Sequence, residues 1–255
     1  MTQAHFHTFW PEQGDGYGKR GQPISWTYFW GHPYEKVVMN APPSKFFAAL
    51  PDGSRTKIPT RAVRMKDEGT GEMRRAYMFT FKPTVLGDHY ICMESPLAFL
   101  EDEGHFLLDF VKQPLHVSIE KGWFQPVGME VEIIPLTRPY GIEEGSIFRG
   151  QALHNGKPIA NALVTIEKFN GFYVAPESLP RDPFGNENTP LITQAVLTDS
   201  NGYFVCTLNE PGWWVLAVSL RDGERARDRQ KYPLEKRGSI WVNVYTRYVQ
   251  KRTLK

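Results

Sequence analysis

Two histidines at the start of the chain have the spacing of a metal site on a β-strand. His5 and His7 stand two apart in AHFHTFWP, residues 4–11. On a strand such residues project from one face, roughly 6.5–7 Å apart along it. Both imidazoles can then reach one metal ion if a neighbouring strand supplies a third ligand. Imidazole suits Zn, Ni, Cu and Co alike, so the spacing does not choose the ion. The alternative interpretation is two polar residues on the outer face of an edge strand.

A second route to a metal site depends on where the mature chain begins. If processing makes Gln3 or His5 the first residue, then His5 or His7, respectively, becomes the third. A free amine, two backbone amides and a third-position imidazole form a square-planar site for Cu(II) or Ni(II).

Further candidate ligands follow in the loop motif WGHPYE. Pro33 forces an extended or turn conformation on His32, and Glu35 stands nearby. We interpret His32 and Glu35 as a ligand pair on a loop. The alternative is that His32 satisfies a backbone group within a turn.

Two more histidines complete the candidate set. His89, in GDHYICME, shares a strand face with Ile91 and is either a ligand or a buried core histidine. His105 follows EDEG and can join Asp102 or Glu103, or belong to a solvated acidic turn. The predicted metal ligands are therefore His5, His7, His32 and His89, with Glu35 and His105 as weaker candidates.

Enzyme motifs are absent from the sequence. It contains no Gly-x-Ser-x-Gly elbow, HExxH, P-loop or GxGxxG after a strand. Acidic pairs such as Glu143 and Glu144 are adjacent, so on a strand they would point to opposite faces. We therefore predict that the protein is not an enzyme. With 30 basic and 28 acidic residues the net charge is +2, which gives no case for binding nucleic acid or an anionic membrane.

The distribution of turns and apolar runs predicts an all-β protein. Twenty-two glycines and 20 prolines separate short apolar runs, a pattern typical of many strands joined by turns. The Pro- and Gly-rich stretch PLTRPYGIEEGS suggests a boundary, so we expect two tandem β-sandwich domains, residues 1–139 and 140–255. Asn155-Gly156 indicates a hairpin in the second.

Several other segments have two interpretations each. The segment 169–192 is long for a hairpin loop and is either functional or a surface insertion. The charged segment 221–238 is expected to be a solvated loop or short helix. Cys92 and Cys206 are expected to be buried in strands rather than disulfide-bonded. Six aromatics of the first half form either a sandwich core or a carbohydrate or peptide platform: Trp10, Trp26, Tyr28, Phe29, Trp30 and Tyr34.

The second half resembles the carboxypeptidase-regulatory-like and transthyretin-like sandwiches. The resemblance rests on NGKPIANALVTIEKF, TDSNGYFVCTL and EPGWWVLAV, in that order. It implies a β-sandwich in which Asp199 accepts hydrogen bonds from its own turn.

The whole chain resembles a bacterial periplasmic family with a domain of unknown function, linked with nickel or cobalt uptake. Its more specific points are Gly31-His32-Pro33 and the stretch 128–136, GMEVEIIPL. The resemblance implies a periplasmic binding protein for nickel or cobalt, acting beside membrane metal-uptake components, with its signal peptide removed. No run approaches the roughly 18 apolar residues of a spanning helix. The alternative function is a non-enzymatic envelope interaction or carbohydrate-binding protein.

Overall fold

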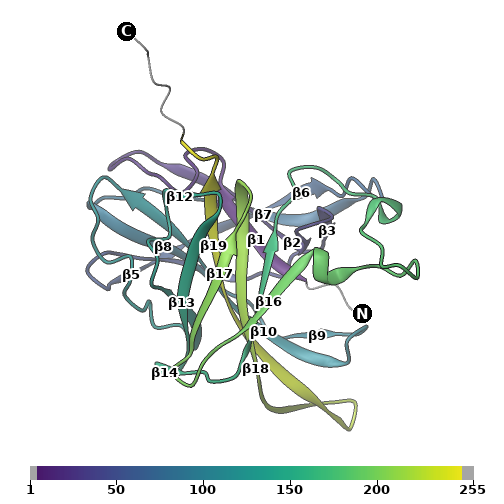
Figure 1. Ribbon diagram of the computed structural model, residues 1–255. Helices are drawn as coiled ribbons and strands as arrows, with labels where there is room; N and C mark the ends of the chain where they lie inside the picture. The colour runs from purple at the N-terminus through teal and green to yellow at the C-terminus, as the bar shows by residue number, and fades with distance from the viewer. Residues whose placement is uncertain (1–4, 249–255) are drawn as a thin grey trace.

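The computed structural model describes residues 5–248 and shows an all-β protein (Figure 1). The described strands form sheets of five, ten and four strands. The predicted all-β, sandwich-like fold is confirmed. Within residues 5–248 the helical segments are two short 3-10 turns, η1 (Pro176–Ser178) and η2 (Thr189–Leu191).

Each sheet draws on strands that are distant in sequence. The five-stranded sheet has the order β1-β2-β7-β6, with β3 beside β2. Its strands are β1 (Phe6–Pro11), β2 (Ile24–His32), β3 (Val37–Met39), β6 (Thr60–Lys66) and β7 (Met73–Phe81). The four-stranded sheet has the order β11-β13-β14, with β17 beside β13. Its strands are β11 (Val131–Pro135), β13 (Ser146–His154), β14 (Lys157–Pro158) and β17 (Tyr203–Leu208).

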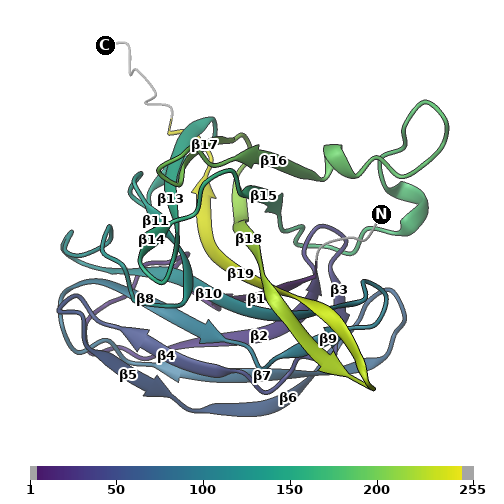
Figure 2. The same cartoon turned by 90° about the horizontal axis from the view of Figure 1, so that it is seen from below.

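The ten-stranded sheet is the common element of the molecule. Its order is β16-β15-β18-β19-β10-β8-β4-β5, with β12 beside β19 and β9 beside β10. Its strands are β4 (Lys45–Ala49), β5 (Arg55–Ile58), β8 (Gly87–Glu94), β9 (Ala98–Leu100), β10 (His105–Val117), β12 (Ile142–Glu143), β15 (Leu163–Lys168), β16 (Thr193–Leu197), β18 (Gly212–Arg227) and β19 (Gln230–Tyr245). In Figure 2, β2, β6 and β7 lie below β10 and β19, and β13 and β17 lie above them.

Two hydrophobic cores lie on opposite faces of this shared sheet. Side chains alternate between the faces of a strand, and β18 contributes to both cores. Trp213 and Val215 pack in the core beside the five-stranded sheet. Trp214 and Leu216 pack in the core beside the four-stranded sheet. This explains why WWVLAV is apolar throughout, since a strand covered on both faces has no polar side.

The division expected near residue 140 is crossed by strand pairing. β10 pairs in parallel with β19, with Phe106 opposite Leu234. β11 precedes residue 140 but pairs with β13 in the four-stranded sheet. The two predicted halves therefore share one sheet, and the boundary between domains stays a prediction.

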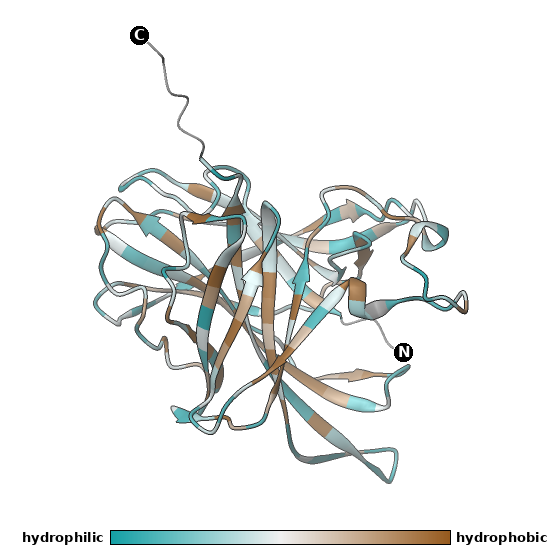
Figure 3. Cartoon of the chain, in the orientation of Figure 1, coloured by the Kyte–Doolittle hydropathy of each residue, from teal (hydrophilic) through white to brown (hydrophobic). Residues whose placement is uncertain are grey.

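The charged segment 221–238 is a hairpin, so its prediction as a loop or short helix was wrong. β18 continues to Arg227 and β19 begins at Gln230. Asp228 and Arg229 both have positive φ, 50° and 65°, and form the turn. The outer end of this hairpin extends from the molecule and is largely hydrophilic (Figure 3), which hides the strand periodicity in the sequence.

Local predictions elsewhere agree with the structure. Asn155 and Gly156 have φ values of 50° and 74° in the hairpin between β13 and β14, as a type I′ turn requires. Cys92 and Cys206 are free and buried, in β8 and β17.

Candidate functional site

Strand register places His5 beside His32. β1 pairs antiparallel with β2, with Phe6 opposite Gly31 and His7 opposite Trp30. His5 precedes β1, and His32 is the last residue of β2, so the same register brings them together. Their ring centroids are 4.6 Å apart in an edge-to-face arrangement. The third group expected from a neighbouring strand is therefore His32.

The turn after β2 is shaped by the residues around His32. A Cβ at Gly31 would lie 1.9 Å from the carbonyl oxygen of Val37, so only glycine permits this close approach of β3. Pro33 leads the chain into the turn, and its carbonyl accepts a hydrogen bond from the Asn170 N–H, at 3.1 Å. Glycine and proline in Gly31-His32-Pro33 thus shape the turn.

Buried atoms without hydrogen-bond partners gather at this turn. Within residues 5–248, both ring nitrogens of His32, Oε1 of Glu35 and Nε1 of Trp30 are buried and have no hydrogen-bond partner. Nδ1 of His32 lies 4.0 Å from Oε2 of Glu35, too far for a hydrogen bond. Glu35 is only 4% exposed. Since buried polar groups are nearly always paired, these atoms call for a functional explanation.

Burial sets the charge states of the pair. Burial, reinforced by the charge of His5, lowers the pKa of His32 to about 4. The imidazole is therefore neutral at neutral pH, which is the form that ligates metals. Burial also raises the pKa of Glu35. No lysine or arginine within residues 5–248 forms an ion pair with Glu35.

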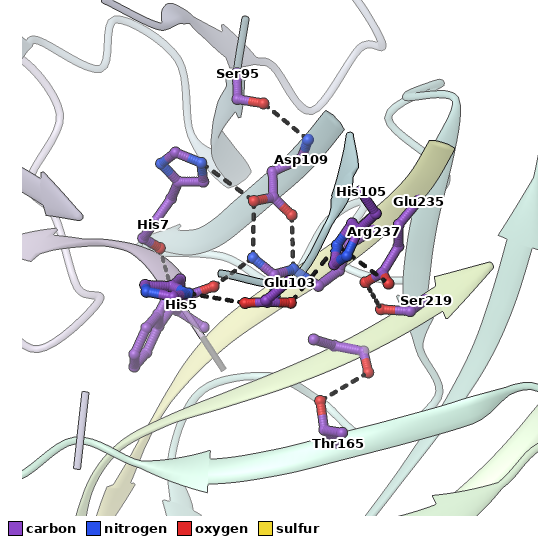
Figure 4. Close-up of polar contacts among 12 residues, drawn as sticks. His5, His7, Ser95, Glu103, His105, Asp109, Thr165, Ser219, Glu235 and Arg237 are labelled. Atoms are coloured by element: carbon purple, nitrogen blue, oxygen red, sulfur yellow. Dashed lines mark hydrogen bonds and ion pairs between the residues drawn. The ribbon is translucent and has the colours of Figure 1, made fainter. Parts of the chain in front are cut away.

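His7 is close to this cluster, but its ring nitrogens are already occupied. Nδ1 lies 2.7 Å from the Tyr28 hydroxyl, and Nε2 lies 3.1 Å from Oδ2 of Asp109. Arg237 donates to both oxygens of Asp109, at 2.7 and 2.8 Å. Burial opposes ionisation of Asp109, but the charge of Arg237 and the hydrogen bond with His7 hold its pKa at about 2. Figure 4 shows the contacts of Asp109 with His7 and Arg237.

One carbonyl group of β1 and one just before it accept hydrogen bonds from side chains of β19. The Arg237 guanidinium donates to the His5 carbonyl. Trp241 Nε1 donates to the His7 carbonyl at 2.9 Å. These contacts fix the backbone that carries both histidines.

Glu103 connects His5 with His105. Nδ1 of His5 lies 3.1 Å from Oε1 of Glu103. Nε2 of His105 lies 3.7 Å from Glu103 and 3.7 Å from Glu235, as Figure 4 shows. The hydrogen bond with His5 is the main cause that lowers the pKa of Glu103, aided by the charge of His105. His105 is thus joined to the cluster through a carboxylate.

His89 lies apart from the other predicted ligands. It is opposite Leu115 in the pairing of β8 with β10, whereas His105 opens β10 ten residues earlier. Ten residues of strand span roughly 33 Å. Nδ1 of His89 instead lies 3.1 Å from the Gly87 carbonyl oxygen, and burial lowers its pKa.

The structure thus brings together His5, His32 and Glu35, with His7 and His105 beside them. The route through a free amine at Gln3 lies outside the described residues. Sequence reasoning missed Asp109 and Arg237. The carboxylate in the apolar run HFLLDFVK was a usable signal for Asp109, whereas Arg237 lies in a charged run and gave none.

Five of the six aromatics proposed as core or platform belong to or pack against a hydrophobic core, and the sixth, Tyr34, lies in the turn after β2. Trp26 and Tyr28 are fully buried and Phe29 is 2% exposed. Trp10, Trp30 and Tyr34 are partly buried. Trp10 packs against Phe169 and Trp213, so it joins the two halves.

A second cluster of ligand-type side chains lies elsewhere. One atom each from Glu130, His154 and Asp222 lie within 4.8 Å of one another. In the part of the chain that the structure describes, no other group of three such residues meets this distance. Nζ of Lys236 contacts both Glu130 and Asp222, so a side-chain ammonium already offsets part of the negative charge of these carboxylates.

The fold defines an all-β protein of packed sandwiches with a histidine and glutamate cluster at the end of one sheet. The chain belongs to the family described as domain of unknown function DUF4198, whose model matches residues 2–222. No curated protein matches the sequence significantly. The membership confirms the predicted domain of unknown function and leaves nickel, cobalt and the transthyretin-like detail as predictions.

Solved structures show only distant likenesses. The D0-D1 domain of intimin matches with 13% identity and a TM-score of 0.24, covering 94% of this chain and 100% of that one. A DUF4785 family protein from Legionella pneumophila matches with 8% identity and a TM-score of 0.32, covering 84% and 51%. Escherichia coli alpha-2-macroglobulin activated by porcine elastase matches with 17% identity and a TM-score of 0.25, covering 94% and 20%. These scores are too low to carry an argument. Separately, none of the helices within residues 5–248 is long and apolar enough to cross a membrane.

Proposed function

We propose that the protein binds a transition-metal ion through His5, His32 and Glu35. The observation that carries the proposal is the set of buried atoms on His32 and Glu35 that have no hydrogen-bond partner among residues 5–248. The His32 ring centroid lies 4.6 Å from that of His5. An ion would give these atoms the partners that the described residues do not provide. Two imidazoles and a carboxylate form a donor set that suits Ni, Co, Cu and Zn.

The surroundings of the cluster favour a cation. Glu103 lies beside His5, and Glu35 beside His32. The nearby Arg237 is engaged by Asp109 through two hydrogen bonds. A divalent ion would therefore enter a region of negative charge without displacing a basic side chain.

The biological role follows from the family resemblance. We propose a periplasmic binding protein that holds nickel or cobalt beside a membrane uptake system. The ion is then cargo, and the site holds and orients it without chemical change. This role requires no catalytic group.

Calorimetric titration of the intact protein with Ni²⁺, Co²⁺, Cu²⁺ and Zn²⁺ tests the proposal. We expect 1:1 binding that weakens by at least about a hundredfold in the H5A/H32A double variant, because two ligands are lost together. H154A, which changes the second cluster, is the matched control and should bind as the parent does. Absence of binding by the intact protein would refute the proposal. Binding that survives H5A/H32A but not H154A would transfer the site to the second cluster.

A further inference from the structure

The three histidines of the first cluster differ in how many ring nitrogens have partners. His7 contacts other side chains through both nitrogens. His32 has no hydrogen-bond partner on either nitrogen among residues 5–248. His5 is intermediate, because its Nδ1 lies 3.1 Å from Oε1 of Glu103. The contact with Glu103 therefore decides what the His5 ring can still bind.

This contact also decides which nitrogen of His5 carries the proton. An ionised carboxylate accepts hydrogen bonds and cannot donate one, so Nδ1 donates to Glu103. In the neutral ring the lone pair is then on Nε2. Neutral imidazole binds a metal ion through such a lone pair. Nε2 is thus the nitrogen of His5 that is left for an ion.

Glu103 is itself held by its surroundings. It lies in the turn between β9 and β10, where its N–H donates to the Leu100 carbonyl at 3.2 Å. Its second oxygen, Oε2, lies 3.7 Å from Nε2 of His105. The same nitrogen lies 3.7 Å from Glu235, which accepts the Ser219 hydroxyl at 2.8 Å. These side chains, shown in Figure 4, restrict the movement of the carboxylate that contacts His5.

The rest of His5 is fixed by different groups. The Arg237 guanidinium donates to its carbonyl. Its ring centroid lies 5.3 Å from that of Trp30 and 4.6 Å from that of His32. The backbone and the ring neighbours are therefore in place, and the hydrogen bond with Glu103 restrains the rotation of the ring.

We infer that Glu103 positions His5 for metal binding, by accepting the proton on Nδ1 and leaving Nε2 for the ion. The inference rests on the proposed function, and it makes Glu103 a positioning residue that does not itself bind the ion. Histidines that bind metals commonly donate their other ring N–H to a carboxylate, which fixes the ring and raises the basicity of the binding nitrogen.

Nuclear magnetic resonance of the full chain with ¹⁵N-labelled histidine tests the inference without changing Glu103. Zn²⁺ is the probe, because its filled d shell causes no paramagnetic broadening. The His5 signals, identified by their absence in H5A, should show a proton on Nδ1 and Zn²⁺ at Nε2. Zn²⁺ at Nδ1 would overturn the inference, because that nitrogen would have left Glu103.

Zn²⁺ titration of three variants separates orientation from charge. E103L removes the acceptor and the charge, so the affinity should fall by about 10- to 100-fold. E103Q keeps an acceptor oxygen without the charge, so its affinity should fall less than that of E103L. D102N is the matched control, since Asp102 is an exposed carboxylate of the same turn, and it should change the affinity by less than about twofold. Urea unfolding without metal shows whether each variant is folded.

The outcomes separate this inference from the proposed function. If folded E103L and D102N bind Zn²⁺ equally, Glu103 does not position His5, although the metal site stands. If E103L does not fold, the protonated nitrogen of His5 in the parent protein decides. If the intact protein binds none of Ni²⁺, Co²⁺, Cu²⁺ and Zn²⁺, the metal site and the role of Glu103 are both refuted. Zn²⁺ binding that involves neither nitrogen of His5 also refutes both.

Discussion

Lys236 and Arg237 are neighbours on β19, yet they supply cations to two different clusters. Side chains alternate along a strand, so Arg237 faces Asp109 and His5, whereas Lys236 contacts Glu130 and Asp222. Both clusters contain histidine and carboxylate groups. They differ in how the basic side chain is used.

In the second cluster the cation is built into the protein. Lys236 lies between the two carboxylates, and His154 is 3.5 Å from Glu130. In the first cluster Arg237 is bound by Asp109, and among residues 5–248 atoms of His32 and Glu35 have no hydrogen-bond partner. Similar residue types thus make a closed ionic network in one place and leave His32 and Glu35 with unpartnered atoms in the other. Ligand-type residues alone do not identify a metal site, because their existing partners decide whether an ion can be added.

Replacing Arg237 with methionine should cause the largest loss of stability. R237M leaves Asp109 buried without its positive partner and removes the donor to the His5 carbonyl. Breaking a buried ion pair on one side costs about 3–5 kcal/mol of unfolding free energy, measurable by urea denaturation. R221M is the control, because Arg221 is exposed on the same hairpin. If R237M and R221M lower the unfolding free energy equally, the buried pair of Asp109 and Arg237 contributes no more to stability than an exposed arginine.

Replacing Lys236 should make the second cluster resemble the first. In K236M the unfolding free energy should fall by about 1–2 kcal/mol, since the two carboxylates are partly exposed and solvent weakens the loss. Glu130, His154 and Asp222 then lack their cation, so weak Ni²⁺ binding should appear in K236M placed in an H5A/H32A background. K231M, an exposed change on the same hairpin, should bind no ion in that background. If K236M in the H5A/H32A background binds no Ni²⁺, the Lys236 ammonium is not what keeps an ion from the second cluster.

Replacing His32 should raise the unfolding free energy, whereas replacing Arg237 or Lys236 should lower it. H32F removes two unpartnered nitrogens and keeps an aromatic ring, so the unfolding free energy at neutral pH should rise by about 1 kcal/mol while metal binding is lost. H154F loses a partnered histidine and should not be stabilised. Thermal and urea unfolding compare the two, and a less stable H32F would contradict the interpretation.

The pH dependence sharpens the same comparison. The pKa of His32 is about 4 in the folded protein, whereas the ordinary pKa of a histidine is 6.5. The contribution of neutral His32 to the unfolding free energy is therefore at its full size above pH 6.5 and is lost as the pH falls to 4. This component of the pH profile should be missing in H32F.

Local features of the fold were predictable because they depend on neighbouring residues. The Asn155-Gly156 turn and the burial of Cys92 and Cys206 in strands depend on short sequence patterns, and both predictions were confirmed. The hairpin 221–238 was not predicted, because its outer part has no apolar face to reveal the strand period. The pairing of β10 with β19 joins residues over a hundred positions apart, which no local pattern indicates.

The candidate site shows the same division. The His5 and His7 spacing was visible in the sequence, as was the pairing of His32 with Glu35 in one loop. The two ring nitrogens of His7 contact Tyr28 and Asp109. The sequence could not predict this, because these partners come from other strands. His89 had the same residue type as the others, but it lies on β8, opposite Leu115 of β10, and this position separates it from them.

The place of β19 in the ten-stranded sheet has a consequence for folding kinetics. β19 is the last described strand, yet it lies between β10 and β18. Asp109 and Arg237, on β10 and β19, are 128 positions apart, so their pairing closes a long loop and raises the contact order. A nascent chain still lacking β19 exposes the inner edges of β10 and β18, and unpaired edges invite association with other chains. Completion of the largest sheet, and with it the anchoring of His5 by Arg237, must therefore wait until β19 has been made.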